Sequence, residues 1–345
     1  MKLGDIARES RETYKGNKTD IPIVGLEHLI SGELRFNDYE VNTDNTFTKV
    51  FHKGQILFGR RRAYLKKAAV AEFDGICSGD ITVIEAIPGN VDARLLPFII
   101  QNDRLFAFAV SRSAGGLSPR VKWEHLADYE FELPSIEEQR VLADKLWAAY
   151  ELKEAYKKMI AATDEMVKSQ FIEMFKGDNQ VPLGDICNIE KGATITRNDV
   201  LPGDIPVVAG GQEPSCYHNV ANREAGAITV SASGAYAGYI NLWSCPIFAS
   251  DCNTVISKDA EKTDQTFVYF GLKAMQKQIY GLQKGGAQPH VYGKDLQKFM
   301  FPHPSYAKQI EFSKMAKQAD KSKFELRQAI DKIDKVIKSL VNEKL

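Results

Sequence analysis

The sequence predicts an α+β fold in which two β-rich domains are separated by an antiparallel two-helix coiled coil. Three observations predict it: the chain repeats itself, each half opens with short β-type segments, and each half closes with a long helical segment. The predicted parts are a β-rich domain over 1–134, a long helix over 135–177, a second β-rich domain over 178–304 and a second long helix over 305–345. Two related halves joined by antiparallel helices predict a pseudo-two-fold internal repeat.

The repeat is visible as several short matches that occur in the same order. AGGLSPRV (114–121) aligns with KGGAQPHV (284–291), LGDI (3–6) recurs at 183–186, and DIPIV (20–24) recurs as DIPVV (204–208). Residues 59–84 align with 233–256 once small gaps are allowed, which places Tyr64 on Tyr236 and Ile84 on Ile256. Chance explains one such match, whereas an ordered series indicates duplication.

Each half begins with short runs rich in Val, Ile, Phe, Tyr and Thr that are broken by Gly, Pro, Asn and Asp, which is typical of a mainly β domain. One helix is predicted over 93–111 and its counterpart over 265–281. A Gly-Gly-x-x-Pro loop follows each helix, and a short strand is predicted after the loop, because Tyr129, Phe131 and Leu133 alternate, as do Phe299 and Phe301. Both loops keep Gly-Gly, Pro and Val, so we interpret them as structural corners whose variable residues are free to face a ligand.

The long helices are predicted from the absence of breakers and from their end signals. No glycine or proline occurs between Pro134 and Gly177, Ser135 with Glu138 fits a capping box, and Gly177 fits a helix C-cap. In the second copy Lys308 replaces the glutamate, so only the serine of the cap remains.

A heptad pattern predicts that the two helices pair along a seam. A lysine occupies the same seam slot in both helices, at Lys153 and Lys323, and a polar residue at one slot can fix register at a cost in stability. The alternative is two amphipathic helices that each pack on their own domain. The length of the helices disfavours this alternative, because a domain of this size does not normally bury so long a helix. The predicted apolar seam consists of Leu142, Leu146, Tyr156, Ile160 and Val167 in the first helix and Phe312, Leu326, Ile330, Ile333 and Ile337 in the second.

The formal net charge is zero, with 45 basic and 45 acidic residues, yet one segment is strongly basic. The run ILFGRRRAYLKKAAV (56–70) carries five cations and no acid. Such runs are often only solvated, but cations interleaved with Phe58 and Tyr64 favour contact with nucleic-acid phosphates. Tyr64 and Tyr236 are equally well explained as core residues.

The remaining bulk features predict a cytoplasmic protein. The five cysteines are odd in number and form no Cys-x-x-Cys pair, which favours reduced thiols. The charged start, MKLGDIARES, lacks the apolar stretch of a signal peptide, and no apolar run is long enough to span a membrane.

Motifs for known catalytic chemistry are absent from the sequence. It has no P-loop, no Gly-x-Gly-x-x-Gly unit, no Gly-x-Ser-x-Gly elbow and no Asn/Asp-Pro-Pro-aromatic segment. The six histidines lack the spacing of metal ligands. The sequence therefore predicts no catalytic residues and no metal site.

As an ensemble, the motifs resemble the specificity subunit of type I restriction-modification systems over essentially the whole chain. The likeness rests on LGDI at the start of each half, on GGLSPRV and GGAQPHV, and on the join LPSIEEQ, with its degraded copy HPSYAKQ, into each long helix. The resemblance implies two target recognition domains, each reading half of a bipartite double-stranded DNA target, and helices that set the gap between half-sites and dock two modification (methyltransferase) subunits. It further implies restriction/translocase subunits, with S-adenosylmethionine, ATP and Mg expected only on these partners and no cofactor on this chain.

Candidate DNA-binding residues differ between the copies, as two readers of different half-sites should. The first copy offers cations suited to phosphate contact and to bidentate pairing of an arginine with guanine, and the second offers hydroxyl, amide and aromatic groups. His290 is a lone histidine in a loop. It either contacts DNA in the second copy only or, as the simpler interpretation has it, makes no functional contact. The candidates are Arg60, Arg61, Arg62, Lys66, Lys67 and Arg120 in the first copy and Lys191, Thr194, Arg197, Ser233, Tyr236, Tyr239, Lys284, Gln288 and His290 in the second.

Two other classes of function fit the sequence less well. A two-headed protein–protein scaffold is disfavoured by the basic run and by the lack of an apolar surface pattern. An enzyme with an unfamiliar site should show paired acids or nucleophiles in both copies, and beyond the LGDI aspartates the aligned copies show none.

Overall fold

The computed structural model describes all residues from 1 to 345. The chain forms two compact units: the first comprises Met1–Ala155 and Ala329–Leu345, and the second comprises Tyr156–Gln328. Each unit therefore contains one β-rich domain together with the adjoining parts of both long helices, α4 (Ile136–Phe175) and α9 (Tyr306–Lys344).

The first unit is built on a five-stranded sheet of order β1-β8-β5-β6-β3 and a three-stranded sheet of order β2-β7-β4. Apolar residues of the sheets, the short helices and both long helices form its cores. Its elements are η1 (Leu3–Asp5), β1 (Ala7–Glu9), β2 (Ile23–Val24), η2 (Leu26–His28), β3 (Arg35–Phe36), β4 (Lys49–Phe51), β5 (Ile56–Gly59), η3 (Ala63–Leu65), β6 (Ala68–Ala71), β7 (Gly75–Cys77), β8 (Ile81–Ala86), α1 (Leu96–Ile100), α2 (Asp103–Ser111) and α3 (Trp123–Leu126).

The second unit repeats this plan with a four-stranded sheet of order β10-β16-β13-β14. A three-stranded sheet of order β12-β11-β15 and the pair β17-β9 complete it. Its elements are β9 (Gln180–Pro182), α5 (Leu183–Ile186), β10 (Cys187–Lys191), β11 (Ile205–Val208), β12 (Cys216–His218), β13 (Ile228–Ser231), β14 (Ile240–Leu242), β15 (Phe248–Ala249), β16 (Cys252–Ser257), α6 (Gln265–Ala274), α7 (Gln276–Tyr280), α8 (Gly293–Gln297) and β17 (Met300–Pro302).

Strand register confirms the duplication and corrects one part of the predicted alignment. Ile56 pairs with Ile84 in the first unit, and Ile228 pairs with Val255 in the second. Ile84 therefore corresponds to Val255 and not to Ile256. The physical reason is the two-residue period of a strand, because Ile84 and Val255 are fully buried whereas Ile256 lies on the exposed face.

Two predicted local elements are also wrong in detail. The single helix over 93–111 is two helices, because Asn102 leaves helical geometry and caps α2 by accepting a hydrogen bond from the Arg104 N–H. Its counterpart over 265–281 also breaks into two helices, at Met275, but there no side chain caps the second helix. The short strand predicted after the second Gly-Gly loop is β17, and a single bridge joins Lys2 to Glu130 at the equivalent place in the first unit. The short helices α3 and α8 lie between the loops and these residues.

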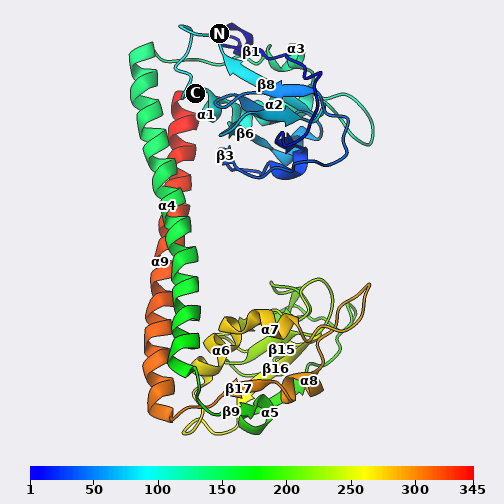
Figure 1. Cartoon of the computed structure of the whole chain (residues 1–345), viewed down its shortest axis with the longest axis vertical. Helices are drawn as coiled ribbons and strands as arrows, with labels where there is room; N and C mark the ends of the chain where they lie inside the picture. Colours follow the sequence, from blue (N-terminus) through cyan, green and yellow to red (C-terminus); the bar gives the residue numbers. More distant parts are fainter. The chain divides into compact units, whose positions relative to one another are not determined.

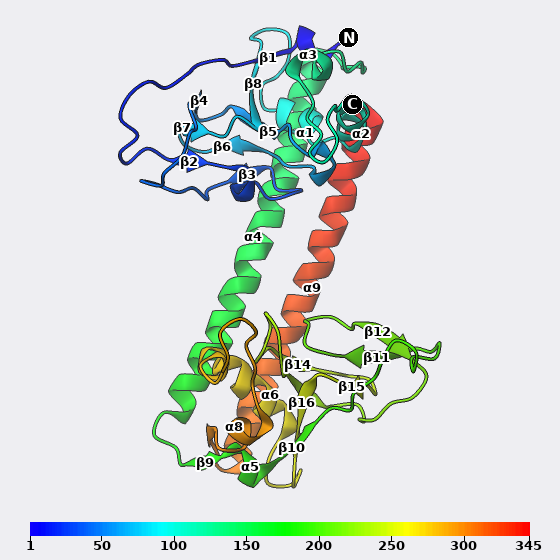
Figure 2. The same ribbon diagram turned by 90° about the vertical axis from the view of Figure 1, so that its right-hand side faces the viewer.

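The long helices run antiparallel, as predicted. In the first unit the start of α4 and the end of α9 share one hydrophobic core, to which Leu146 and Leu345 contribute. In the second unit the end of α4 and the start of α9 share another, to which Phe171 and Phe312 contribute. Figures 1 and 2 show the C-terminal end of α9 beside the beginning of α4. All ten predicted apolar seam side chains are buried or half-buried.

The two seam lysines make reciprocal ion pairs between the helices. In the first unit the Lys153 ammonium lies 2.7 Å from an Asp334 carboxylate oxygen. In the second unit the Lys323 ammonium lies 2.5 Å from Asp164 and 3.0 Å from Asp320. Both lysine side chains are about nine-tenths buried, with exposed fractions of 11% and 10%. A shift in register would separate each lysine from its partner on the facing helix and would leave Lys323 only Asp320, on its own helix.

The predicted capping box is present at the start of α4. The Ser135 N–H and hydroxyl donate to the Glu138 carboxylate at 3.0 and 2.7 Å, and the Glu138 N–H donates back to the hydroxyl. In the second copy the ammonium of Lys308 instead contacts Asp178, at 3.3 Å.

A glutamine at the same position of both joins fastens each long helix to its domain. Gln139 accepts a hydrogen bond from the Asp92 N–H and donates to the Pro134 carbonyl. Gln309 repeats both contacts, with the Asp264 N–H at 2.9 Å and the Pro304 carbonyl at 3.0 Å, and adds the Lys262 carbonyl at 3.0 Å. These contacts explain why the repeat keeps this glutamine.

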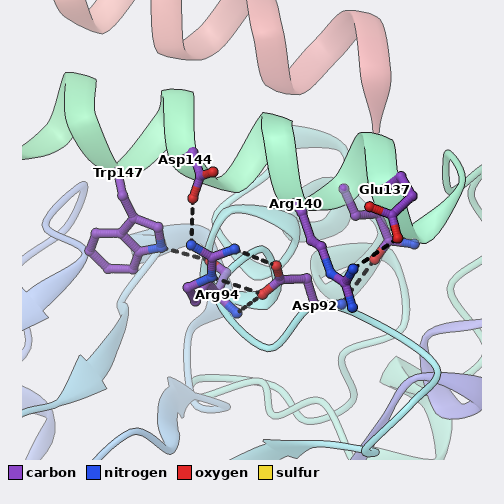
Figure 3. Close-up of polar contacts among 7 residues, drawn as sticks. Asp92, Arg94, Glu137, Arg140, Asp144 and Trp147 are labelled. Carbon is purple, nitrogen blue, oxygen red and sulfur yellow. Dashed lines mark hydrogen bonds and ion pairs between the residues drawn. The ribbon is translucent and has the colours of Figure 1, made fainter.

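The first unit reinforces this join with a network centred on Arg94 (Figure 3). The Arg94 guanidinium donates to Asp92, which precedes α1, and to Asp144 on α4. The Trp147 indole N–H donates to the Arg94 carbonyl at 2.8 Å. Hydrogen bonds from Arg94 hold the pKa of Asp92 below its ordinary value, so the carboxylate stays charged at neutral pH.

We expect Gln309→Ala to lower the free energy of unfolding of the second unit by about 1–3 kcal/mol, because a buried N–H and two carbonyls lose their partner. Gln139→Ala should lower the free energy of unfolding of the first unit by less, because only the Asp92 N–H and the Pro134 carbonyl lose their hydrogen-bond partner. Hydrogen exchange resolved by mass spectrometry measures each unit separately. Gln318→Ala, on the exposed face of α9, is the control, and equal effects of Gln309→Ala and Gln318→Ala would contradict the assignment.

All five cysteines are free thiols. Burial raises the pKa of the Cys77, Cys187 and Cys252 thiols to about 12, so these three remain protonated at neutral pH. None of the helices is long and apolar enough to cross a membrane.

Candidate nucleic-acid interface

The Gly-Gly loops, residues 114–120 and 284–290, have the same backbone in both units. Ala114 and Arg120 exchange two backbone hydrogen bonds, of 3.0 and 2.9 Å, and Lys284 and His290 exchange theirs at 2.9 and 2.8 Å. The first glycine of each loop has a positive φ, 114° at Gly115 and 96° at Gly285, which explains why glycine is kept there.

Each Gly-Gly loop docks on the segment that follows the central strand of its sheet. The Arg62 N–H donates to the Pro119 carbonyl at 2.8 Å, and the Gly234 N–H donates to the Pro289 carbonyl at 3.0 Å. Isolated β-bridges join Arg61 to Arg120 and Ser233 to His290. The fold thus brings the predicted residues near 60 and near 120 to one place, and those near 233 and 290 to the equivalent place.

An aspartate supports this junction in both units. Asp80 accepts from the Arg61 and Arg120 guanidiniums, at 3.2 and 2.7 Å, and Asp251 accepts from the Ser233 hydroxyl. Partial burial opposes ionisation of Asp80, but hydrogen bonds and charge from Arg120 and Arg61 outweigh it, so the pKa of Asp80 lies below its ordinary value.

The sequence comparison missed this shared aspartate for an identifiable reason. Aligning Ile84 with Ile256 places Asp80 on Cys252, whereas the observed register places it on Asp251. Moving the second copy by one residue, so that SGDIT (78–82) aligns with ASDCN (249–253), would have revealed the match.

The basic turn after β5 holds two residues in an unfavourable backbone conformation. Arg62 and Lys66 have φ of 53° and 50°, in the left-handed region that side-chain-bearing residues rarely adopt. The equivalent positions of the second unit are Gly234 and Gly238, with φ of 82° and 89°. The first unit therefore carries cations where the same backbone favours glycine, and such strain is typical of functional positions.

The first-unit candidates differ in how far their side chains are engaged. Arg62 is exposed, and no hydrogen bond or ion pair engages its guanidinium. The Lys66 ammonium contacts Asp103 at 2.6 Å, and the Lys67 ammonium donates to the Leu26 carbonyl at 2.7 Å. Arg60 is half-buried, and its Nε lacks a partner.

The second-unit candidates include an exposed set and an engaged set. Lys284 is paired with Asp295 at 2.7 Å, and the Lys273 ammonium lies 4.7 Å from the centre of the Tyr239 ring. Tyr236, like Tyr64 in the first unit, is about half exposed, so neither tyrosine is a core residue. Lys284 is exposed as well as paired. The other exposed candidates are Lys191, Thr194, Arg197, Tyr236 and Gln288.

The arrangement of the two loops is suited to recognition. Each unit presents a fixed loop with variable side chains beside a turn that is cationic in the first unit, and no three His, Cys, Asp or Glu side chains are grouped so as to hold a metal ion. Fixed loops carrying variable polar and cationic groups are typical of proteins that read nucleic-acid sequence. The fold and the two loops therefore fit the class of proteins that carry two related recognition domains.

The chain belongs to the type I restriction-modification DNA specificity family. The family model, described as the type I restriction modification DNA specificity domain, matches residues 1–161 and again 177–335, one match for each half. The family is a DNA-recognition component of restriction-modification systems and not a catalytic one.

Known relatives agree with this membership. The chain is 22% identical over 158 residues to the type I restriction enzyme EcoDI specificity subunit of Escherichia coli, a match that covers 44% of this chain and 35% of that protein. The crystal structure of a type I restriction-modification S subunit from M. genitalium superposes with a TM-score of 0.64 at 15% identity, covering 99% of this chain and 94% of that one. A chain from a type I restriction-modification system superposes with a TM-score of 0.57 at 18% identity, covering 100% and 96%. These structures confirm the fold.

Proposed function

We propose that this chain is a DNA-sequence specificity subunit in which each β-rich domain reads one half of a bipartite duplex target. The helices α4 and α9 set the gap between half-sites and dock two modification (methyltransferase) subunits. Methylation, and cleavage by restriction/translocase subunits, are then performed by these partners in the cytoplasm. S-adenosylmethionine, ATP and Mg belong to the partners in this proposal, and the scaffold alternative is not favoured.

Similar proteins support the proposed partners. A chain with the same fold is described in connection with complex assembly and conformational transition of the type I restriction-modification system. Another is described as the S subunit of such a system. Because assembly is reported for proteins of this fold, the same assembly is the simplest proposal for this chain.

We further propose that DNA contacts the Gly-Gly loops and the residues beside them. Arg62, Arg120, Arg197, Tyr236 and Gln288 rank first because they are exposed. Lys67, Lys284 and Tyr239 rank lower, since contact with DNA would displace their present partners.

The observation that carries the DNA-binding assignment is the left-handed Arg62, because its counterpart in the repeat is Gly234. We expect Arg62→Gly to weaken DNA binding while leaving the fold unchanged or more stable by about 1 kcal/mol, since strain is relieved. Loss of one phosphate contact should reduce the slope of log K against log salt by about 0.9. Fluorescence anisotropy over a salt series, with the assembled complex, measures both quantities.

Lys176→Ala provides the control, because it removes one exposed cation that follows α4 and belongs to neither Gly-Gly loop. This variant should bind DNA as the wild type does. Equal affinity and equal salt slope for Arg62→Gly and the wild type would rule out Arg62 as a phosphate contact.

A further inference from the structure

The Arg120 guanidinium is held in one orientation, with one edge left open. Its Nε donates to one carboxylate oxygen of Asp80 at 2.7 Å, and its Nη2 donates to the other at 3.3 Å. Its Nη1 makes a longer contact with the Ser118 carbonyl, at 3.4 Å. A guanidinium has five N–H groups, so two remain, one on each terminal nitrogen, and 43% of the side chain is exposed.

Asp80 is itself fixed, which makes the orientation of Arg120 a property of the fold. Its side chain is only 20% exposed, and it also accepts from Arg61 Nη1 at 3.2 Å. Arg61 is held at its other end, because its Nη2 donates to the Ser118 hydroxyl at 3.0 Å. Arg61 therefore acts as a support, while Arg120 presents free donors.

The second unit keeps the support and changes the presented group. Asp251 stands at the position of Asp80, Ser233 at that of Arg61 and His290 at that of Arg120. The His290 ring stacks on Tyr292, with 6.0 Å between ring centres. Asp251 contacts Ser233, so the second unit keeps the acid while the side chain at the position of Arg120 changes. Such a change is expected where two copies of one frame read different bases.

We propose that Arg120 reads a guanine in the half-site of the first domain, with Asp80 as the positioning residue that aims it. The inference rests on the proposed function. In the major groove, guanine presents two neighbouring acceptors, N7 and O6, which match two parallel N–H donors. No other base presents this pair, so a fixed guanidinium edge discriminates guanine from the rest.

The test is selection from a randomised DNA duplex library by the chain assembled with its modification subunits, followed by sequencing of the bound fraction. The wild type should select a split motif with a guanine in one half-site. Arg120→Ala and Arg120→Lys should each reduce discrimination at that one position by roughly ten- to a hundredfold, because neither retains the paired donors. The other half-site should be unchanged.

The Asp80→Asn variant tests whether Arg120 acts through its orientation toward a base or through its charge toward phosphate. The amide offers only one acceptor oxygen to Arg120, so discrimination at the same guanine should fall while the salt dependence of binding stays constant. His290→Ala, the counterpart in the second unit, should alter only the other half-site, or neither. Circular dichroism confirms folding of each variant.

The outcomes separate this inference from the proposed function. An Arg120→Ala variant that selects the unchanged motif, with every sequence weakened equally, would identify Arg120 as a phosphate contact and overturn the inference. A wild-type motif with no guanine in the affected half-site would overturn it as well. If the wild-type complex selected no motif at all, the proposed function itself would fail.

Discussion

Truncating Phe312 to alanine is expected to lower the free energy of unfolding of the second unit by about 3–5 kcal/mol. Phe312 is fully buried where α9 meets α4 and α6. Its ring centre lies 5.4 Å from that of Phe171, 5.5 Å from that of Phe175 and 6.2 Å from that of Phe267. Because this cluster joins both long helices to the domain, the cavity should loosen all three together.

Hydrogen exchange of α4, α6 and α9, read by mass spectrometry, measures this effect. The amides of these helices in the second unit should exchange faster, while those of the first unit, which has a separate core, should not change. Phe324→Ala removes the same group from a site on α9 that is 57% exposed and should change stability by less than about 0.5 kcal/mol. Faster exchange confined to α9 would contradict a core shared with α4 and α6.

Inserting one heptad into both long helices, next to Ala155 in α4 and Gln328 in α9, should lengthen the recognised gap or abolish binding. Seven residues add about 10.5 Å to a helix, which corresponds to roughly three base pairs of duplex. A heptad nearly preserves the apolar seam, so each unit should keep its core. Selection from a randomised library measures the gap in the recognised motif.

The control for this change is insertion into α4 alone. The helices would then differ in length, so Lys153 and Lys323 could not both keep their partners across the seam. That variant should be destabilised and should not bind with a longer gap. An unchanged gap in the double insertion would contradict the role of the helices in setting the spacing.

The architecture could be predicted because the sequence contains patterns that extend over many residues. Duplication, heptad spacing and the Ser135–Glu138 cap each depend on residues whose spacing reports the structure directly. The breaks at Asn102 and Met275 could not be predicted in the same way. The first break depends on one local cap residue, Asn102, within the polar run Gln-Asn-Asp-Arg (101–104). At the second break Met275 makes no side-chain cap hydrogen bond, so only the local backbone geometry shows that the helix ends.

The candidate interface was predictable in place but not in detail. Matching loops pointed to the same place in both copies, yet the sequence could not show that Arg61 contacts both Asp80 and Ser118 or that Asp80 holds the Arg120 guanidinium. Both arginines contact Asp80, which lies far from Arg120 in the sequence, and the alignment of Ile84 with Ile256 hid its match with Asp251. Likewise, backbone strain at Arg62 became visible only once φ was known.

Mapping of methylated bases in cells with and without this chain, in the presence of its modification subunits, tests the central claim most directly. The account predicts one split motif that appears only when the chain is present, with two different half-sites at a fixed gap. Substitutions at Arg120 should change one half-site and leave the other intact. A methylation pattern that is identical with and without the chain would contradict the account.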